Sequence, residues 1–471
     1  MAFLKDNLWK VFTFTLILGI SLSRTIAIAE PDSFWQIKSG QDFLKHSQFL
    51  ASDTYSWSAF GAEYLSNSWL WNALLGWIYN VASFEGVSVL VGVYVGLTLV
   101  LSALYLRSRN IGWGSIFIGV SVISILLGKW FTSRPQVNDY LLLVLGLLVI
   151  QKLSQKSMIS LFVVLGFIIL LWNNLHLTGP VGALCFGGMY FLALYNGDVS
   201  LWGKETFSAI IRSVALIIFL LGLCFITPYG MSGITKSFET ASASAGLISE
   251  WISPWDLSEN SNFSSAVALL VIFLPLVLRV KEKRWVEAVF LLGIFAVGSY
   301  QARWVPFVLL MALPYICGDL EKARIFGVHQ FMPYIKVTAL SVVLATLTMG
   351  VTTFFAEDRV SRGGYGYAIL DEVPQGCKLY NDVSFGGPMI LMRPDVKVSM
   401  DGRNDLYGRE EYLEQAYLTY AIEGTDRWLE DNGITCVLIH SYQGLDTYLS
   451  HQNTWEMRAE DSHGARLWVK K

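Results

Sequence analysis

Long hydrophobic runs separated by short polar segments fill the first 355 residues of this chain of 471 residues. About 20 apolar residues in a helix cross a bilayer. Runs of this kind occupy residues 9–28, 87–106, 111–130, 138–154, 158–173, 178–196, 207–226, 264–280, 285–302, 304–318 and 333–355. The pattern therefore predicts an α-helical polytopic membrane protein with about 11 transmembrane helices.

The pattern changes after residue 355, where short strand-like runs alternate with helical ones. Strands are predicted at 377–380, 396–400, 434–440 and 466–469, and helices at 410–422 and 426–432. Gly386-Gly387 and Asp401-Gly402-Arg403 are expected in turns at strand ends. We therefore expect a transmembrane domain at 1–355, with outer loops at 29–86 and 227–263, and a small extracytoplasmic α/β domain at 356–471.

The charge composition supports this division. Only 15% of the residues are charged, against about 25% in an ordinary soluble protein. Residues 356–471 hold 31 of the 71 charges, with 12 basic and 19 acidic residues. This composition excludes a nucleic-acid binder driven by bulk positive charge, a disulfide-rich secreted scaffold and a disordered protein.

The short loops indicate the orientation, because Lys and Arg are retained on the cytoplasmic side. With the N-terminus in the cytoplasm, the inner loops carry most of the basic residues: Lys5, Lys10, Arg107, Arg109, Lys152, Lys156, Lys204, Arg279, Lys281, Lys283, Arg284, Lys322 and Arg324. An odd number of spans then places the C-terminal domain outside a plasma (bacterial inner) membrane. A cleavable signal peptide ending at Ala27-Ile28-Ala29 is the alternative for the first span, and it leaves Glu30 outside as well.

Polar residues recur at the predicted outer ends of the helices. They are Glu30, Asp32, Arg134, Asn174, His176, Glu250, Trp251 and Arg303. Each alone fits a snorkelling side chain or a helix-end turn. Together they indicate a site for an anionic amphiphile, because charge at membrane depth is costly without a partner. Glu30 and Asp32 could supply a general base or bind a divalent cation, and a solvated pair on a loop is the simpler alternative. No cofactor is certain from the sequence.

Several short motifs, taken in order, resemble bacterial proteins of the glycosyltransferase C (GT-C) superfamily, in a branch with a small C-terminal soluble domain. The motifs are Glu30-Pro31-Asp32-Ser33-Phe34-Trp35, Asp53-Thr54-Tyr55-Ser56, Trp69-Leu70, Arg134-Pro135-Gln136, Trp172-Asn173-Asn174-Leu175-His176, Pro228-Tyr229-Gly230, Glu250-Trp251-Ile252-Ser253-Pro254, and Asp401-Gly402-Arg403 with Asp405 and Tyr407. The resemblance covers nearly the whole chain.

The resemblance implies a multi-pass membrane glycosyltransferase of the cell envelope. Such an enzyme moves a hexosyl or pentosyl group from a polyprenyl-phosphate carrier to a glycan, lipid or protein acceptor at the outer membrane surface. Its expected catalytic group is an acid in the first outer loop, where Asp32 matches and Glu30 stands where relatives often have Asp. Where relatives often have Asn-His-Glu-Trp, this chain has Ser66-Asn67-Ser68-Trp69, which puts in doubt any metal or second acid that depends on that His and Glu.

The chemistry assigns roles to these residues. Asp32 is the expected base, with Glu30 beside it, and a single displacement inverts the anomeric centre. Arg134 and Arg303 are candidates for the donor phosphate, because a guanidinium binds phosphate well. The candidates for contacting the acceptor or orienting a substrate are His176, Asn174, Glu250, Trp251, Asp401 and Arg403. For His176 a purely structural role is equally expected.

Two other functional classes stay open. A polytopic transporter would need internal repeats and polar residues at the bilayer midplane, and the sequence shows no convincing repeat. A non-catalytic GT-C-like scaffold in envelope polysaccharide assembly is compatible with Ser66-Asn67-Ser68. Cys377 and Cys436 lie on predicted strands in an oxidising compartment, so either a disulfide or two free thiols is compatible with the sequence.

Overall fold

The computed structural model of the chain describes residues 2–26, 30–49, 51–195, 203–244, 248–256, 262–323, 332–355 and 367–471. The chain divides into two compact units. The helical unit consists of Met1–Thr25, Val89–Ile234 and Ala245–Ala356, and the mixed unit consists of Ile26–Ser88, Thr235–Ser244 and Glu357–Lys471. The segment after the first span thus packs with the C-terminal segment, although the two are far apart in the sequence.

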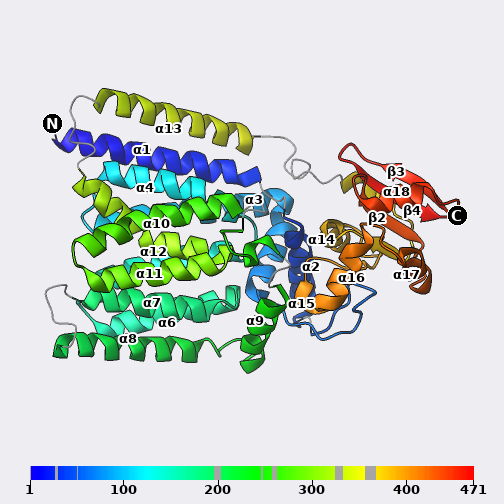
Figure 1. The fold of residues 1–471 in the computed structure, drawn as a ribbon, viewed down its shortest axis with the longest axis horizontal. Helices are drawn as coiled ribbons and strands as arrows, with labels where there is room; N and C mark the ends of the chain where they lie inside the picture. The colour runs from blue at the N-terminus through cyan, green and yellow to red at the C-terminus, as the bar shows by residue number, and fades with distance from the viewer. Residues whose placement is uncertain are drawn as a thin grey trace. The chain divides into compact units, whose positions relative to one another are not determined.

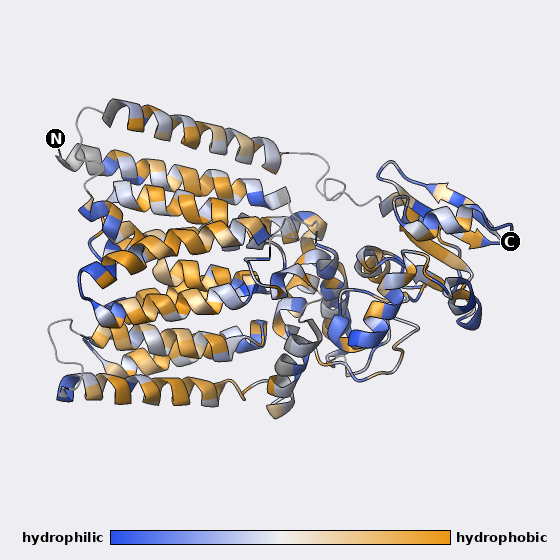
Figure 2. Cartoon of the chain, viewed as in Figure 1, coloured by the Kyte–Doolittle hydropathy of each residue, from blue (hydrophilic) through white to orange (hydrophobic). Residues whose placement is uncertain are grey.

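The helical unit is a bundle of apolar helices that lie side by side (Figure 1). Its helices and short 3₁₀ turns are α1 (Ala2–Ser23), η1 (Arg24–Ile26), α4 (Trp113–Leu126), η2 (Gly128–Trp130), α5 (Gln136–Leu153), α6 (Met158–Leu175), α7 (Gly179–Leu194), α8 (Lys204–Leu223), η3 (Ser249–Trp251), α10 (Phe263–Lys281), α11 (Trp285–Tyr300), η5 (Ala302–Trp304), α12 (Val305–Lys322) and α13 (Met332–Phe354). Figure 2 shows that these helices are hydrophobic over most of their length, with hydrophilic residues near their ends.

Among the described residues, seven helices are long and apolar enough to cross a membrane: Trp69–Ser108, Gln136–Leu153, Met158–Leu175, Lys204–Leu223, Phe263–Lys281, Ala302–Lys322 and Tyr334–Phe354. Each coincides with a predicted span. Four further predicted spans fall on the shorter apolar helices Asn7–Ser23, Trp113–Leu126, Gly179–Leu194 and Trp285–Tyr300. The protein is therefore a polytopic membrane protein by length and composition, and the count of about 11 stays a prediction.

Helix α3 (Trp69–Ser108) is longer than the span predicted at 87–106. The structure extends this helix back to Trp69, across a kink. Ala82 and Ser83 have non-helical backbone angles there, and the φ of Ser83 is 53°. A non-glycine residue in this region interrupts the regular hydrogen-bond ladder, so α3 changes direction just before the predicted span.

One end of the bundle is tied by Arg279 of α10. Its Nη1 lies 2.8 Å from Oδ1 of Asp319 on α12, and its Nε lies 3.0 Å from Oε2 of Glu287 on α11. Arg279 is 3% exposed, and a charge so well buried needs such partners. Part of the predicted cytoplasmic basic cluster is therefore neutralised by carboxylates on neighbouring helices.

The mixed unit contains a four-stranded sheet in the order β1-β2-β4-β3. Its strands are β1 (Leu379–Asn381), β2 (Cys436–His440), β3 (Trp455–Glu460) and β4 (Ala465–Lys470), and its helices are α2 (Pro31–His46), η8 (Tyr367–Glu372), α14 (Val383–Met392), α15 (Asn404–Tyr407), α16 (Arg409–Leu418), α17 (Thr425–Asp431) and α18 (Gly444–Ser450). β1 pairs with β2 in parallel, and the other pairs are antiparallel. Helix α9 (Met231–Ser244) contributes residues to both units.

The structure confirms a small C-terminal α/β region and corrects some of its elements. The predicted strand at 396–400 forms only an isolated bridge from Val398 to Ser56, and β3 was not predicted. Gly386 and Gly387 lie inside helix α14 and not in a turn.

Gly387 lets helix α14 approach helix α2 closely. A Cβ atom at position 387 would lie 2.0 Å from the backbone oxygen of Pro31. Because a backbone atom cannot swing aside as a side chain can, only glycine fits at this contact. The segment after the first span and the C-terminal segment thus approach each other closely, backbone to backbone, within the mixed unit.

The mixed unit also contains the disulfide between Cys377 and Cys436, with Cα atoms 6.0 Å apart. The other three cysteines, Cys185, Cys224 and Cys317, are free. Cys377 lies just before β1 and Cys436 is the first residue of β2, so the bond joins two neighbouring strands of the sheet.

Substituting Gly387 with Ala is expected to destabilise the mixed unit by about 1–3 kcal/mol, the usual range for overpacking a tight contact. Thermal unfolding of the purified protein in detergent measures this change. Gly318→Ala in helix α12 is the control, because a Cβ there would meet nothing within 4 Å. Equal melting of the two variants would contradict the close approach.

Alkylation of the denatured protein tests the disulfide. Without reductant, three thiols should be labelled, and after reduction all five cysteines should react. Intact mass spectrometry counts the adducts. Labelling of five thiols without reductant would show that Cys377 and Cys436 are not bonded.

Candidate functional site

The centre of the mixed unit is a fully buried arginine between two carboxylates. Nη1 of Arg403 lies 2.8 Å from Oδ1 of Asp53. Its Nε and Nη2 donate to Oδ1 and Oδ2 of Asp401 at 2.8 and 2.6 Å, so this contact is bidentate. Arg403 is 1% exposed and both carboxylates are 0% exposed. The guanidinium also lies 5.0 Å from the ring centre of Tyr64 and 5.2 Å from that of Tyr55.

The neighbours of Arg403 keep it charged. Burial alone lowers the pKa of Arg403, but the charge of Asp401 and its hydrogen bonds, together with Tyr407 and Asp53, raise it well above its usual value. Tyr407 donates from its hydroxyl to Oδ2 of Asp401 at 2.7 Å. Burial and the Asp401 carboxylate raise the pKa of Tyr407 well above its usual value. The hydroxyl therefore stays protonated and remains a donor at neutral pH.

Local backbone structure fixes both carboxylates. Asp53 lies in a tight loop closed by the bridge between Ser52 and Glu63. Its Oδ2 accepts hydrogen bonds from the backbone N and the hydroxyl of Ser56, at 3.0 and 2.6 Å. Oδ1 of Asp401 also accepts from the backbone N of Arg403 at 2.9 Å. Each carboxylate is thus an Asx-type turn anchor as well as an ion-pair partner.

Asp32 lies in the first turn of α2, beside this network. Its Oδ1 accepts a hydrogen bond from Nε1 of Trp35 at 3.2 Å. A Cβ atom at Gly402 would lie 1.8 Å from that same oxygen. Gly402 stands between Asp401 and Arg403 in the chain, so the buried ion pairs place a bare backbone directly against the Asp32 carboxylate.

Glu30 is the residue before α2 and is partly buried, but its side chain does not cap the helix. Its carboxylate and that of Asp32 were the candidates for a divalent cation. Across the part of the chain that the structure describes, no group of three or more His, Cys, Asp or Glu side chains could hold a metal ion.

Asp405, in the same motif region, is held by helix α9. Nζ of Lys236 lies 3.4 Å from Oδ2 of Asp405 and donates to its backbone oxygen at 3.2 Å. The hydroxyl of Thr240 donates to the same carboxylate at 3.1 Å. The predicted outer segment 227–263 therefore contributes a helix to the mixed unit.

A second polar cluster lies in the helical unit. Nη1 of Arg134 lies 3.6 Å from Oε1 of Glu250. Cζ of Arg303 lies 3.8 Å from the ring centre of Trp251, the residue after Glu250. Arg303 also interacts electrostatically with Glu250 and Arg134. The structure therefore brings together Arg134, Glu250, Trp251 and Arg303, four of the residues singled out from the sequence.

Two more charged residues, which the sequence analysis did not select, belong to this cluster. Lys129 interacts electrostatically with Glu250. Asp139 interacts with Arg303. Three cations, Lys129, Arg134 and Arg303, therefore face the two carboxylates of Glu250 and Asp139. Asp139 lies in the first turn of α5, directly after the motif Arg134-Pro135-Gln136. Helical spacing from this motif is the sequence signal that could have identified Asp139.

His176 and Asn174 are held by the ends of the helices. Nδ1 of His176 lies 2.7 Å from Oδ2 of Asp139, and both residues are buried. Nδ2 of Asn174 donates to the backbone oxygens of Leu170 and Ile226, at 2.8 and 3.0 Å. Asn174 thus joins the end of α6 to the segment after α8, and His176 joins it to α5.

The segment that departs from the GT-C pattern forms a buried network of its own. Nδ2 of Asn72 donates to the hydroxyl of Ser66 at 3.0 Å, and the hydroxyl of Ser68 donates to Oδ1 of Asn72 at 3.2 Å. Both serines and Asn72 are buried. These residues satisfy one another and stabilise the start of α3.

Comparison with known proteins shows the fold alone. The chain matches the crystal structure of the Archaeoglobus fulgidus oligosaccharyltransferase in its apo form, with a TM-score of 0.50 and 10% sequence identity. The match covers 90% of this chain and 69% of that one. No family model and no curated protein matches the chain. The fold is therefore similar to that of an archaeal oligosaccharyltransferase, in line with the multi-pass helical fold expected from the sequence.

Arg403→Met is expected to lower the free energy of unfolding by about 3–5 kcal/mol, because it leaves Asp53 and Asp401 buried without a compensating charge. Arg427→Met, at an exposed position on α17, should change it by less than about 0.5 kcal/mol. Chemical unfolding in detergent measures both. Adding Asp53→Asn and Asp401→Asn to Arg403→Met should recover part of the loss, and an unchanged stability of Arg403→Met would contradict the ion-pair assignment.

Proposed function

We propose that this protein is a GT-C-type membrane glycosyltransferase that moves a sugar from a polyprenyl-phosphate carrier to an acceptor at the outer face of the plasma membrane. The observation that carries the proposal is Asp32, an acid held beside Gly402 in a chain whose fold is similar to that of an oligosaccharyltransferase. One fold can carry many activities, so the assignment depends on the chemistry of two clusters: Asp32 with the Arg403 ion pairs, and Arg134 and Arg303 with Glu250.

Asp32 is the proposed general base. In a single displacement, the acceptor oxygen forms a bond to the anomeric carbon as the bond from that carbon to the phosphate oxygen breaks. The acceptor proton passes to the carboxylate, and the configuration at the anomeric carbon inverts. The hydrogen bond from Trp35 fixes one carboxylate oxygen, which orients the other for the acceptor hydroxyl. A positioned base of this kind contributes typically 10²–10⁴-fold in rate.

Arg134 and Arg303 are the proposed phosphate ligands. The departing phosphate gains negative charge, and guanidinium groups stabilise it by charge-assisted hydrogen bonds. The excess of cations over carboxylates around Glu250 leaves positive charge for such a group. Trp251 holds Arg303 by a ring contact of 3.8 Å. Glu250 and His176 would orient the phosphate or the acceptor, whereas the amide of Asn174 is engaged with backbone oxygens.

Asp401 and Arg403 act as positioning residues in this proposal. Both are fully buried, so they do not reach a substrate. Their bidentate contact holds the backbone of Gly402 against Asp32. A cell-envelope location, with membrane lipid around the bundle and the mixed unit outside the cytoplasm, follows from the same proposal.

One observation favours a non-catalytic scaffold as a second candidate. Asn67 and Ser68 stand where relatives often have His and Glu, and the hydroxyl of Ser68 is hydrogen-bonded to Asn72. Neither a metal nor a second acid is supplied at that place. An enzyme of this form would therefore depend on Asp32 and Glu30 alone for its acid groups.

Asp32→Asn should abolish the transfer of sugar from a polyprenyl-phosphate donor while folding and membrane insertion are preserved. The loss should be about 10²-fold or more, because the amide cannot accept the acceptor proton. A radiolabelled polyprenyl-phosphate sugar incubated with membranes that carry the variant measures it. Asp426→Asn, at an exposed position of α17, is the matched control and should keep full activity.

The same labelled donor separates the three functional classes. Transfer by the wild type and not by Asp32→Asn supports the enzyme. Binding without turnover by both supports the scaffold, and movement of a soluble solute across proteoliposomes supports a transporter. Full activity of Asp32→Asn would refute the role of that carboxylate.

A further inference from the structure

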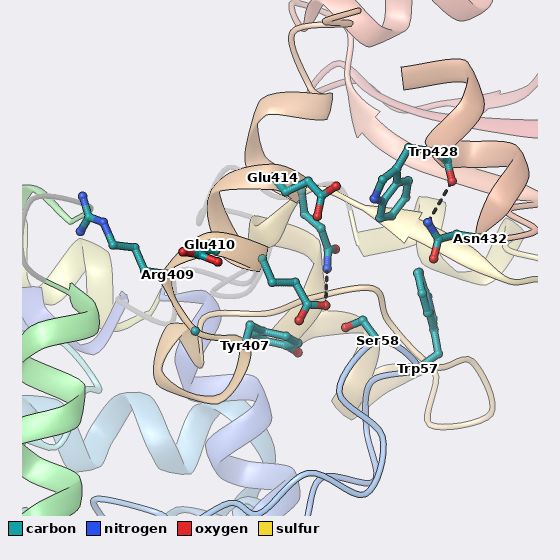
Figure 3. A pocket seen from close by; sticks show the side chains of 11 residues that line it. Trp57, Ser58, Tyr407, Arg409, Glu410, Glu414, Trp428 and Asn432 are labelled. Carbon is teal, nitrogen blue, oxygen red and sulfur yellow. Dashed lines mark hydrogen bonds between the residues drawn. The ribbon is translucent and has the colours of Figure 1, made fainter. Parts of the chain in front are cut away.

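A cavity of about 1030 Å³ opens within the mixed unit, at the upper limit of typical ligand sites. The residues that line it include two tryptophans, Trp57 and Trp428, and four side chains of helix α16, Glu410, Glu411, Glu414 and Gln415. Figure 3 shows Trp57 and Trp428 on one side, Glu410 and Glu414 on another, and Arg409 extending away from them. The proposed transfer reaction uses none of the side chains at the rim of this cavity.

Two tryptophans form its aromatic wall. The ring centres of Trp57 and Trp428 are 6.2 Å apart, with the rings tilted by 50°. Nε1 of Trp57 donates to the backbone oxygen of Leu379 at 2.7 Å, and the ring of Trp428 packs edge-on against that of Tyr380. Both tryptophans are half-buried. They are therefore fixed platforms and not mobile surface side chains.

The opposite wall is one face of helix α16. Glu411, Glu414 and Gln415 lie at spacings of three and four residues, which places them on the same side of the helix. Burial raises the pKa of Glu411, with a further contribution from Glu414 and opposition from Gln415. The cavity therefore presents one carboxylate, that of Glu411, that is partly shielded from water, and a second, that of Glu414, at its exposed rim.

Gln415 supplies the observation that points to a ligand. It lines the cavity, yet it is 1% exposed. Its Nε2 donates to Oε1 of Glu411 at 3.3 Å, but its Oε1 finds no hydrogen-bond partner among the residues that the structure describes. A buried acceptor left unsatisfied is costly. A hydrogen-bond donor from a bound molecule would satisfy it.

We propose that this cavity binds a neutral oligosaccharide. Sugar hydroxyls donate hydrogen bonds to the Gln415 amide oxygen and to the Glu411 and Glu414 carboxylates, while the apolar C–H face of a sugar ring packs on the tryptophans. Three glutamates against one arginine repel uronic acids and phosphorylated sugars.

A basic peptide is the other ligand that an acidic, aromatic cavity fits, and one contact disfavours it. Nζ of Lys378 already lies 4.6 Å from the ring centre of Trp57. A ligand cation would meet this resident positive charge, whereas a neutral sugar ring would not. Lys378 therefore disfavours a cationic ligand, and the glutamates of the cavity disfavour an anionic one.

Tyr407 connects this cavity to the buried network. It lines the cavity and donates to Asp401, which precedes Gly402 beside Asp32. Binding itself does not depend on any reaction. The further statement that the bound saccharide is part of the acceptor does rest on the proposed glycosyltransferase function.

Ligand binding by the full-length protein in detergent tests the proposal. The probes are maltotetraose, cellotetraose and chitotetraose, with tetragalacturonate as the anionic comparison and trilysine as the cationic one. Saturation-transfer NMR and tryptophan fluorescence measure binding. At least one neutral tetrasaccharide should bind with a Kd of about 1 mM or lower, with tetragalacturonate and trilysine weaker.

Gln415→Leu and Glu411→Gln should weaken that binding about tenfold or more, the effect of one lost hydrogen bond. Glu423→Gln, exposed and outside the cavity, is the control and should bind as the wild type does. Glu414→Gln, at the exposed rim, gives the same test if Gln415→Leu fails to fold.

Three results would overturn the proposal: no neutral tetrasaccharide bound at about 10 mM, unchanged binding in the Glu411→Gln and Glu414→Gln variants, or tighter binding of trilysine than of any saccharide. Asp32→Asn should retain saccharide binding. Failure of binding and failure of transfer are therefore separate outcomes.

Discussion

The buried charge of Arg403 is the constraint on which the mixed unit depends. A guanidinium removed from water costs several kcal/mol unless carboxylates surround it. Asp401 comes from the same loop, but Asp53 comes from the segment after the first span, more than 300 residues earlier. Neither segment can bury its charges alone. The ion pairs therefore join the segment after the first span and the C-terminal segment into one unit, and the close contact of Gly387 in α14 with Pro31 in α2 joins the same two segments.

This constraint also determines the environment of Asp32. The backbone of Gly402 meets the Asp32 carboxylate because its neighbours on both sides are fixed by ion pairs. In the motif Asp401-Gly402-Arg403, the two charged residues thus hold the backbone in place, and the glycine leaves room for the Asp32 carboxylate. A charged pair that looks like substrate-binding chemistry in the sequence is a scaffold for a different residue. The proposed base, Asp32, is the acid with partial exposure, since fully buried carboxylates cannot exchange protons with an acceptor.

The sequence predicts the helices well and the contacts between segments poorly, for a physical reason. Hydrophobic runs are local, so the spans and the helices around 410–422 and 426–432 coincide with observed ones. The pairing of Arg403 with Asp53 is not local. In the sequence, Asp53 and Asp401 both have the appearance of loop residues. Gly386-Gly387 suggests a turn because glycine is flexible, whereas α14 uses it for its lack of a side chain. Residues 396–400 alternate apolar and polar side chains like a strand, yet Val398 forms a bridge to Ser56, in the segment after the first span, instead of pairing with a neighbouring strand. The periodicity of the sequence therefore could not predict that the segment after the first span packs with the C-terminal segment.

Electrostatics separates the two polar surfaces by the kind of molecule that each suits. In the helical unit, Lys129, Arg134 and Arg303 outnumber the carboxylates around Glu250, and such a cluster attracts a phosphate. In the mixed unit, the cavity on α16 has three glutamates and one arginine, so it repels a phosphate and accepts hydroxyl donors. A lipid-linked donor is anionic and a saccharide acceptor is not. In the proposed transfer reaction, the opposite charges of the two surfaces would therefore direct the lipid-linked donor and the saccharide acceptor to different surfaces before they react. This separation needs no specific recognition of either sugar.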